Sequence, residues 1–153
     1  MPELKLPLNG GCQCGAVRYR ITGQPLTLYA CHCLDCQKQS SSAFGLSLWV
    51  DQDDFEIVQG TLNEWVTHGD SGEQKRCTFC GLCGSRIHHL SGDERSPFSV
   101  KGGTVDDPSV LEPIGHIWVK RAHDWLGLQE SSKPCFETEP ESFDGLIEAW
   151  RDR

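Results

Sequence analysis

The order of apolar and polar residues along the chain predicts a mainly β protein built from short antiparallel strands. In the segment 43–50 every even-numbered residue is large and apolar, so one face of a strand would be buried there. Similar patterns predict further strands at 16–21, 26–30, 55–58, 62–66, 86–90, from 98 onward, and at 116–120. Strands 55–58 and 62–66 are expected to form a hairpin, because only Gln59-Gly60-Thr61 separates them.

Helix is expected only at the edges of this β framework. Ser142 is placed to cap a terminal helix at about 143–151, whose apolar residues fall on one face. Those residues are Phe143, Leu146, Ile147 and Trp150. The polar run 37–42 predicts a single helical turn that ends in a loop. We interpret 1–153 as one domain, with 131–153 as a C-terminal extension that carries the terminal helix.

Composition and charge narrow the class of protein. A chain of 153 residues, of which 37% are hydrophobic, fits one soluble globular domain with a modest core. The formal charge is −8, and seven thiolates on two zinc ions would bring it to about −11. Nucleic-acid binding depends on neutralising phosphates with Lys and Arg. The charge and the absence of a basic block in the sequence therefore argue against a nucleic-acid or chromatin partner.

The nine cysteines point to metal or catalysis. The first residues lack the apolar core of a signal peptide, and no run approaches the roughly 20 apolar residues of a membrane span. We therefore expect a cytoplasmic protein without a membrane partner, in a reducing environment where free thiols persist. Sixteen glycines and eight prolines suggest many turns, which metal crosslinks would help to hold together.

Seven cysteines fall into three closely spaced groups, and the densest group has three thiols within six residues. The groups are Cys12 and Cys14; Cys31, Cys33 and Cys36; and Cys80 and Cys83. Thiolates at such spacing favour Zn²⁺, which they bind at about 2.3 Å. Three protein ligands from one loop would leave a tetrahedral ion with an open position for substrate or water.

The spacing leaves two divisions of the thiols open. A zinc ribbon would pair Cys33 and Cys36 with the C-x-x-C of 80–83, which leaves the other thiols unassigned. Alternatively, the C-x-C at 12–14 joins the pair at 80–83 in a closed site, and the loop 31–36 forms a three-thiolate site.

Three motifs together resemble the glutathione-dependent formaldehyde-activating enzyme family, which also includes centromere protein V. They are Gly-Gly-Cys12-x-Cys14-Gly-x-Val17-Arg-Tyr, Cys31-His-Cys33-x-x-Cys36 and Phe79-Cys80-x-x-Cys83-Gly, in that order. The sequence His116-Ile-Trp-Val also fits the family pattern, so the resemblance covers roughly residues 8–125.

The resemblance implies the second division of thiols and two zinc ions per chain. A structural zinc would be bound by Cys12, Cys14, Cys80 and Cys83, and an open, catalytic zinc by Cys31, Cys33 and Cys36. It also implies a zinc-bearing β-tent fold and a carbon–sulfur lyase activity on an adduct of glutathione and formaldehyde, such as S-hydroxymethylglutathione. The alternative is a noncatalytic, zinc-stabilised binding module. The sequence does not predict the oligomeric state.

An acid or base is also needed, because the oxygen of the adduct must gain or lose a proton. His32 and Asp35 are the nearest titratable residues in sequence and are the candidates for this role. His116 and Trp118 share a strand face and are predicted to fill the core or line a pocket. His88 and His89 lie on opposite faces of a strand, so at most one can face a site.

The other polar and thiol candidates have simpler interpretations. Cys77 and Cys135 lie outside the paired motifs and are predicted not to bind metal. Lys38, Arg76 and Arg86 could attract an anionic thiol peptide, although solvated surface charge also explains each of them.

Overall fold

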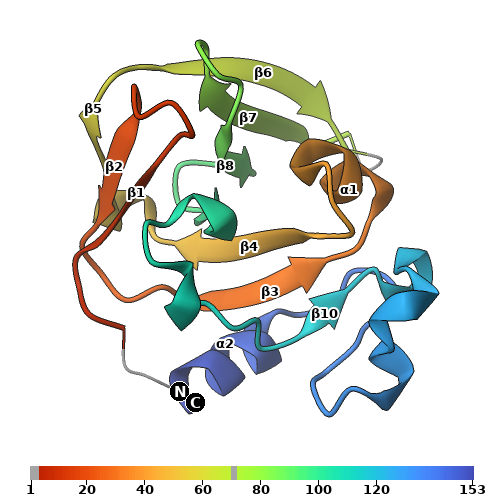
Figure 1. The fold of residues 1–153 in the computed structure, drawn as a ribbon. Helices are drawn as coiled ribbons and strands as arrows, with labels where there is room; N and C mark the ends of the chain where they lie inside the picture. Colours follow the sequence, from red (N-terminus) through yellow and green to blue (C-terminus); the bar gives the residue numbers. More distant parts are fainter. Residues whose placement is uncertain (1–3, 70–71) are drawn as a thin grey trace.

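The protein folds into two β-sheets of short strands, with helices at their margins (Figure 1). The computed structural model describes residues 4–69 and 72–153. The strands are β1 (Leu8–Gly11), β2 (Arg18–Ile21), β3 (Thr27–Cys31), β4 (Gly45–Val50), β5 (Phe55–Gln59), β6 (Leu62–His68), β7 (Gln74–Cys80), β8 (Arg86–Ser91), β9 (Phe98–Lys101) and β10 (His116–Ile117). The α-helices are α1 (Leu34–Ser40) and α2 (Asp144–Arg151).

The smaller sheet has the order β1-β2-β5 and the larger sheet the order β10-β3-β4-β9-β8-β7-β6. Strand β10 pairs with β3 in parallel, whereas the other paired strands are antiparallel. The expected β-tent-like class, mainly β with a short C-terminal helix, is confirmed. Neither helix among the described residues is long and apolar enough to cross a membrane.

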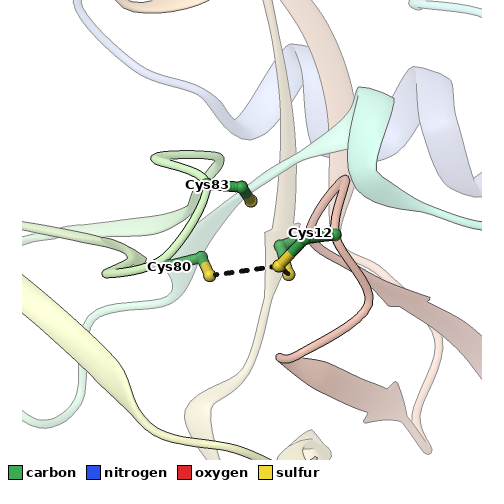
Figure 2. Close-up of side chains that lie close together, drawn as sticks. Cys12, Cys80 and Cys83 are labelled. Atoms are coloured by element: carbon green, nitrogen blue, oxygen red, sulfur yellow. Dashed lines mark hydrogen bonds between the residues drawn. The ribbon is translucent and has the colours of Figure 1, made fainter.

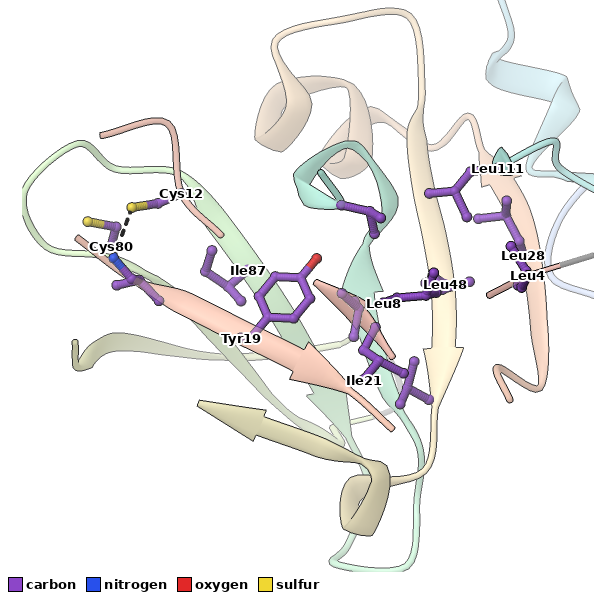
Figure 3. Packing of buried hydrophobic residues seen from close by; sticks show 14 of the residues in the cluster. Leu4, Leu8, Cys12, Tyr19, Ile21, Leu28, Leu48, Cys80, Ile87 and Leu111 are labelled. Carbon is purple, nitrogen blue, oxygen red and sulfur yellow. Dashed lines mark hydrogen bonds between the residues drawn. The ribbon is translucent and has the colours of Figure 1, made fainter. Parts of the chain in front are cut away.

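The main core lies between the two sheets (Figure 3). Tyr19 and Ile21 of β2 are fully buried and face Ile87 of β8 and Leu48 of β4. These positions follow the period of two expected for strands with one buried face. Cys12 and Cys80 belong to the same cluster, so one group of thiols lies at the end of the core.

The predicted hairpin between 55–58 and 62–66 is wrong, because the two strands belong to different sheets. β5 pairs with β2 and β6 pairs with β7. Gly60, between them, has φ 78°, and a Cβ there would lie 2.2 Å from the carbonyl oxygen of Ala16. This close approach requires glycine, and the chain passes here from one sheet to the other.

The predicted strand 116–120 is too long. β10 ends at Ile117, because Trp118 adopts the left-handed conformation at φ 58° and ψ 36° and residues 119–121 form a 3-10 turn. Consequently His116 and Trp118 do not share one face of a strand, in contrast to the prediction. The helical turn predicted at 37–42 is also displaced, since α1 begins at Leu34 and includes Cys36.

The terminal helix is confirmed, and it covers β3 (Figure 1). The hydroxyl of Thr27 donates to the carbonyl of Leu146 at 2.9 Å, and both residues are buried. The ring of Phe143 lies 5.4 Å from that of Tyr29, centroid to centroid. The N-cap position predicted for Ser142 is instead taken by Phe143. The Ser142 hydroxyl, one residue earlier, accepts from the backbone N–H of Asp144 at 3.1 Å.

Candidate metal centres

Four thiols converge where the loop after β1 meets the turn after β7 (Figure 2). The sulfur atoms of Cys12, Cys14, Cys80 and Cys83 all lie within 4.8 Å of one another. Two sulfur–sulfur distances are 3.5 Å, between Cys12 and Cys14, and 3.8 Å, between Cys14 and Cys80. A tetrahedral Zn²⁺ with bonds of about 2.3 Å separates its sulfur ligands by about 3.8 Å, so this donor set fits the ion.

At this four-thiol site, hydrogen bonds to Cys12 and Cys83 favour the thiolate form that binds metal. The backbone N–H of Val17 donates to the Cys12 sulfur at 3.2 Å. Ser85 Oγ lies 3.3 Å from the Cys83 sulfur, and this side-chain hydrogen bond, with backbone donors, lowers the pKa of Cys83 to about 5. Gly84 closes the turn with φ 81°, a conformation that glycine adopts without strain.

The second group forms a three-thiol site made from a strand end and a helix start. Cys31 is the last residue of β3, Cys33 is the N-cap of α1, and Cys36 lies in the first turn of that helix. Their sulfur atoms lie within 4.8 Å of one another. The Cys36 N–H donates to the Cys33 sulfur at 3.3 Å, and hydrogen bonds from Cys31 and Cys36 hold the pKa of Cys33 well below its usual range. A helix start also favours negative charge.

The structure therefore brings the seven paired thiols together as four and three. Among the described residues, no further Cys, His, Asp or Glu side chain joins the three-thiol site as a potential ligand. The two groups are compatible with two metal ions. Their chemistry, sulfur donors close enough for a tetrahedral ion, suits zinc.

Comparison with known proteins assigns the chain to a family. Residues 7–121 match the family model described as glutathione-dependent formaldehyde-activating enzyme. The chain belongs to the glutathione-dependent formaldehyde-activating enzyme family. It is 26% identical, over 159 aligned positions, to a protein of Halomonas elongata that is provisionally named a glutathione-dependent formaldehyde-activating enzyme. The alignment covers 95% of each chain.

A solved structure shows the same fold. A crystal structure of a Rhodobacter sphaeroides protein superposes with a TM-score of 0.52 at 17% sequence identity. The match covers 84% of this chain and 98% of the Rhodobacter chain. At that level of identity the similarity concerns the fold alone.

In this family member the predicted acid–base candidates lie in different surroundings. His32 is fully buried, and its Nε2 lies 3.0 Å from Nδ1 of His116, in a hydrogen bond that the sequence does not predict. Burial, together with the neighbouring histidines, lowers the pKa of His32 to about 4, so the ring is neutral near pH 7. Asp35 is exposed in the first turn of α1.

The three predicted surface cations also differ from one another. Lys38 is exposed on α1, and Arg76 lies 3.5 Å from Glu64 in a surface ion pair. Arg86 is half-buried, and its Nη1 lies 2.9 Å from Nε2 of His89. Lys38 and Arg76 are thus exposed surface charges, whereas Arg86 contacts a buried histidine.

Lys101 is a residue near the three-thiol site that sequence reasoning does not single out. Its Nζ donates to Oε1 of Gln39, in α1, at 3.3 Å. Burial lowers the pKa of Lys101, and the nearby Cys36 thiolate opposes that shift. The sequence signal was weak, because Phe98-Ser-Val-Lys101 reads as a strand with Ser and Lys on a solvent face.

The remaining two cysteines provide a direct test of the ligand assignment. Cys77 is fully buried and Cys135 is exposed, and neither sulfur belongs to the four-thiol or the three-thiol site. We expect Cys77→Ser and Cys135→Ser each to keep about two zinc ions per chain, measured by elemental analysis of purified protein. Cys83→Ser is the matched control, in which the zinc content should fall. Loss of one zinc ion in either test variant would show that the ligands are divided differently.

Proposed function

We propose that this protein is a zinc-dependent carbon–sulfur lyase that acts on a small thiol adduct of the glutathione and formaldehyde type. The observation that carries the proposal is the unequal division of thiols: four in one site and three in the other. A four-thiolate zinc is closed, whereas a three-thiolate zinc retains one position for an exogenous ligand. The family relationship supports glutathione and formaldehyde as the chemical class.

Cys31, Cys33 and Cys36 would hold the catalytic ion, and Cys12, Cys14, Cys80 and Cys83 the structural one. Zinc bound by three thiolates would supply a position that keeps an external thiol in its nucleophilic thiolate form near neutral pH. Three thiolates already neutralise the ion, so activation of water is less favoured there than at a zinc with three imidazoles.

The chain itself must then place the aldehyde carbon and handle one proton. In the synthetic direction a carbon–sulfur bond forms, the carbonyl π electrons move to oxygen, and that oxygen takes up a proton. In the lyase direction the same proton leaves and the carbon–sulfur bond breaks. We retain Asp35 and His32 as candidates for this proton transfer, with His32 acting within its hydrogen-bonded pair with His116.

The proposed partner is a small thiol or its aldehyde adduct, and not a nucleic acid, because the chain carries a net charge of −8. We propose a cytoplasmic location, since thiolate ligands persist best where disulfides are kept reduced.

We expect the three-thiol site to bind an external thiol as a fourth ligand. Binding should release a proton, because the thiolate is the form that coordinates metal. The affinity for glutathione should therefore rise with pH until the free thiol ionises, near a pKa of about 8.5 for a cysteine-type thiol. Calorimetry of the zinc-loaded protein in buffers of different ionisation enthalpy measures the released proton, and zinc X-ray absorption measures the sulfur neighbours.

Cys31→Ala is the matched variant, and it should weaken thiol binding while the protein stays folded. An average sulfur count per zinc that does not change at saturating thiol, without proton release, would contradict the proposal. The noncatalytic, zinc-stabilised binding module would then be the better description.

A further inference from the structure

The sheet face that carries Cys31 continues away from the three-thiol site as a polar surface. Directly paired residues of antiparallel strands share a face, as do residues two apart in one strand. Cys31 pairs with Gly45 and Ser47 pairs with Lys101, while His89 pairs with both Ser99 and Cys77. By the same pairings Tyr29, Trp49 and Trp65 also lie on this face. We give the name polar face to the following members beyond Cys31: Ser47, Lys75, Cys77, His89, Ser99 and Lys101, together with Arg86, which bonds to His89.

Helix α1 connects the polar face to the three-thiol site. A Cβ built on Gly45 would lie 3.4 Å from Cβ of Cys36, so the helix crosses the sheet on this face. Gln39, one turn after Cys36, accepts the hydrogen bond from Lys101 Nζ at 3.3 Å. Lys101 is therefore the first cation reached from the thiols along the face. Arg86 and Lys75 lie beyond it, on β8 and β7.

Within the described part of the chain, no carboxylate pairs with the cations of the polar face. Among residues 4–69 and 72–153, carboxylates pair with Arg18, Arg20, Arg76, Arg95 and Lys133. Lys75, Arg86 and Lys101 are absent from these pairs, although each is half-buried. Arg86 instead stacks over the Trp65 ring, with Cζ 5.6 Å from its centroid. Besides its hydrogen bond to Gln39, Lys101 has the thiols of Cys36 and Cys31 among its anionic neighbours. A carboxylate from outside the chain would give these partly desolvated cations a charge-assisted hydrogen bond that no described carboxylate supplies.

The local positive charge is unusual because the whole chain carries a charge of −8. At physiological salt, charges more than about 8 Å apart are largely screened. A small anion beside Lys101 would thus respond chiefly to this residue and its neighbours, and less to the distant acidic surface. The polar face can therefore attract an anion even though the protein as a whole repels one.

We propose that Lys101, assisted by Arg86, binds a carboxylate of the thiol whose sulfur occupies the three-thiol site. The inference rests on the proposed function and narrows its substrate class to anionic thiols and their adducts, in preference to neutral ones of the same size. Lys101 is a specificity-determining residue in this proposal. It binds the carboxylate remote from the reacting sulfur and takes no part in bond making.

The test compares two thiols of similar size, 3-mercaptopropionate and 2-mercaptoethanol, by calorimetry with the zinc-loaded full chain. After correction for the thiolate fraction of each thiol, we expect the carboxylate thiol to bind about tenfold more tightly, as for one charge-assisted hydrogen bond. In Lys101→Met the two thiols should bind with about equal affinity, because the affinity for 3-mercaptopropionate falls and the affinity for 2-mercaptoethanol does not change. Added salt should reduce the preference of the wild-type protein.

Lys38→Met is the matched control, because it removes the same charge from an exposed position on α1. It should keep the preference for 3-mercaptopropionate. Equal affinities of the wild-type protein for the two thiols, or an equal loss in both variants, would overturn the carboxylate site alone. Binding of neither thiol would overturn the proposed function as well. If Lys101→Met fails to fold, the wild-type ratio and its salt dependence still decide the question.

Discussion

Cys80→Ser is expected to abolish folding, whereas Cys36→Ser should stay folded with about one zinc ion fewer. The reason is the position of each site. Cys12 and Cys14 follow a strand of the smaller sheet, and Cys80 and Cys83 flank a turn of the larger sheet, so a metal here joins the two sheets. Structural zinc contributes about 10–16 kcal/mol in small zinc domains, which is comparable to the whole stability of a domain, about 5–15 kcal/mol.

The three-thiol site connects only neighbouring elements, β3 and α1, which also make other contacts with the sheet. Circular dichroism, soluble yield and zinc content of the two variants measure the difference. Cys80 is also buried in the main core, so Cys14→Ser, at an exposed thiol, is the control that separates loss of metal from loss of packing. Equal damage in Cys36→Ser and Cys14→Ser would refute this hierarchy.

His88→Phe should make the protein markedly more resistant to acid. His88 is buried between Phe98, whose ring is 3.9 Å away by centroids, and Phe55. Its Nδ1 has no hydrogen-bond partner among the described residues. Burial, with a smaller effect of Lys101, lowers the pKa of His88 from 6.5 to about 4. The folded state therefore disfavours the imidazolium that the unfolded chain accepts.

The direction in which stability changes with pH follows from the pKa values of His88 in the unfolded and folded states. The stability of the folded state is complete above pH 6.5, where His88 is neutral in both states, and it falls as the pH decreases from 6.5 to about 4. His88 alone should account for about 2 kcal/mol of the loss between pH 7 and pH 5. Denaturant unfolding is measured in excess zinc at both pH values, for the wild type and for His88→Phe. The comparison gives the part of the stability loss that His88 causes. Acid also releases zinc from both proteins, so the difference between them is the measured quantity. Identical acid sensitivity would contradict the assignment.

Much of the fold follows from local patterns. Alternation over 43–50 identifies a strand whose Leu48 and Val50 are fully buried, and the spacing of Leu146 and Trp150 identifies the terminal helix. Sheet membership is not local, which is why the pairing of 55–58 with 62–66 is wrong. The sheet that each of these two strands joins depends on the close approach of Gly60 to Ala16, more than forty positions away in the chain. The left-handed Trp118 is equally invisible to a pattern of alternation.

The candidate metal sites are easier to predict from the sequence than the residues around them. Spacing alone groups Cys31, Cys33 and Cys36, and the resemblance to the family separates them from the other four thiols. Lys101 escapes such reasoning, since a strand with one polar face normally turns that face to water. Here the polar face is partly covered by α1 and bears half-buried cations. Alternation of polar and apolar residues therefore predicts the strand, but it does not predict that Lys101 is half-buried near the three-thiol site.

The contacts of β3 with later parts of the chain affect the order in which the two thiol sites can form during synthesis. The bond between Thr27 and Leu146 spans 119 residues, and β10 also reaches β3 from far along the chain. Residues 116–117 and 144–151 must therefore be synthesised before β3 gains its parallel neighbour and its helical cover, and such long-range contacts form slowly. Cys31, Cys33 and Cys36 need no distant partner, whereas Cys14 must wait for Cys80, 66 residues later. The nascent chain can thus assemble the three-thiol site, which we expect to contribute less to stability, before the four-thiol site that lies between the two sheets.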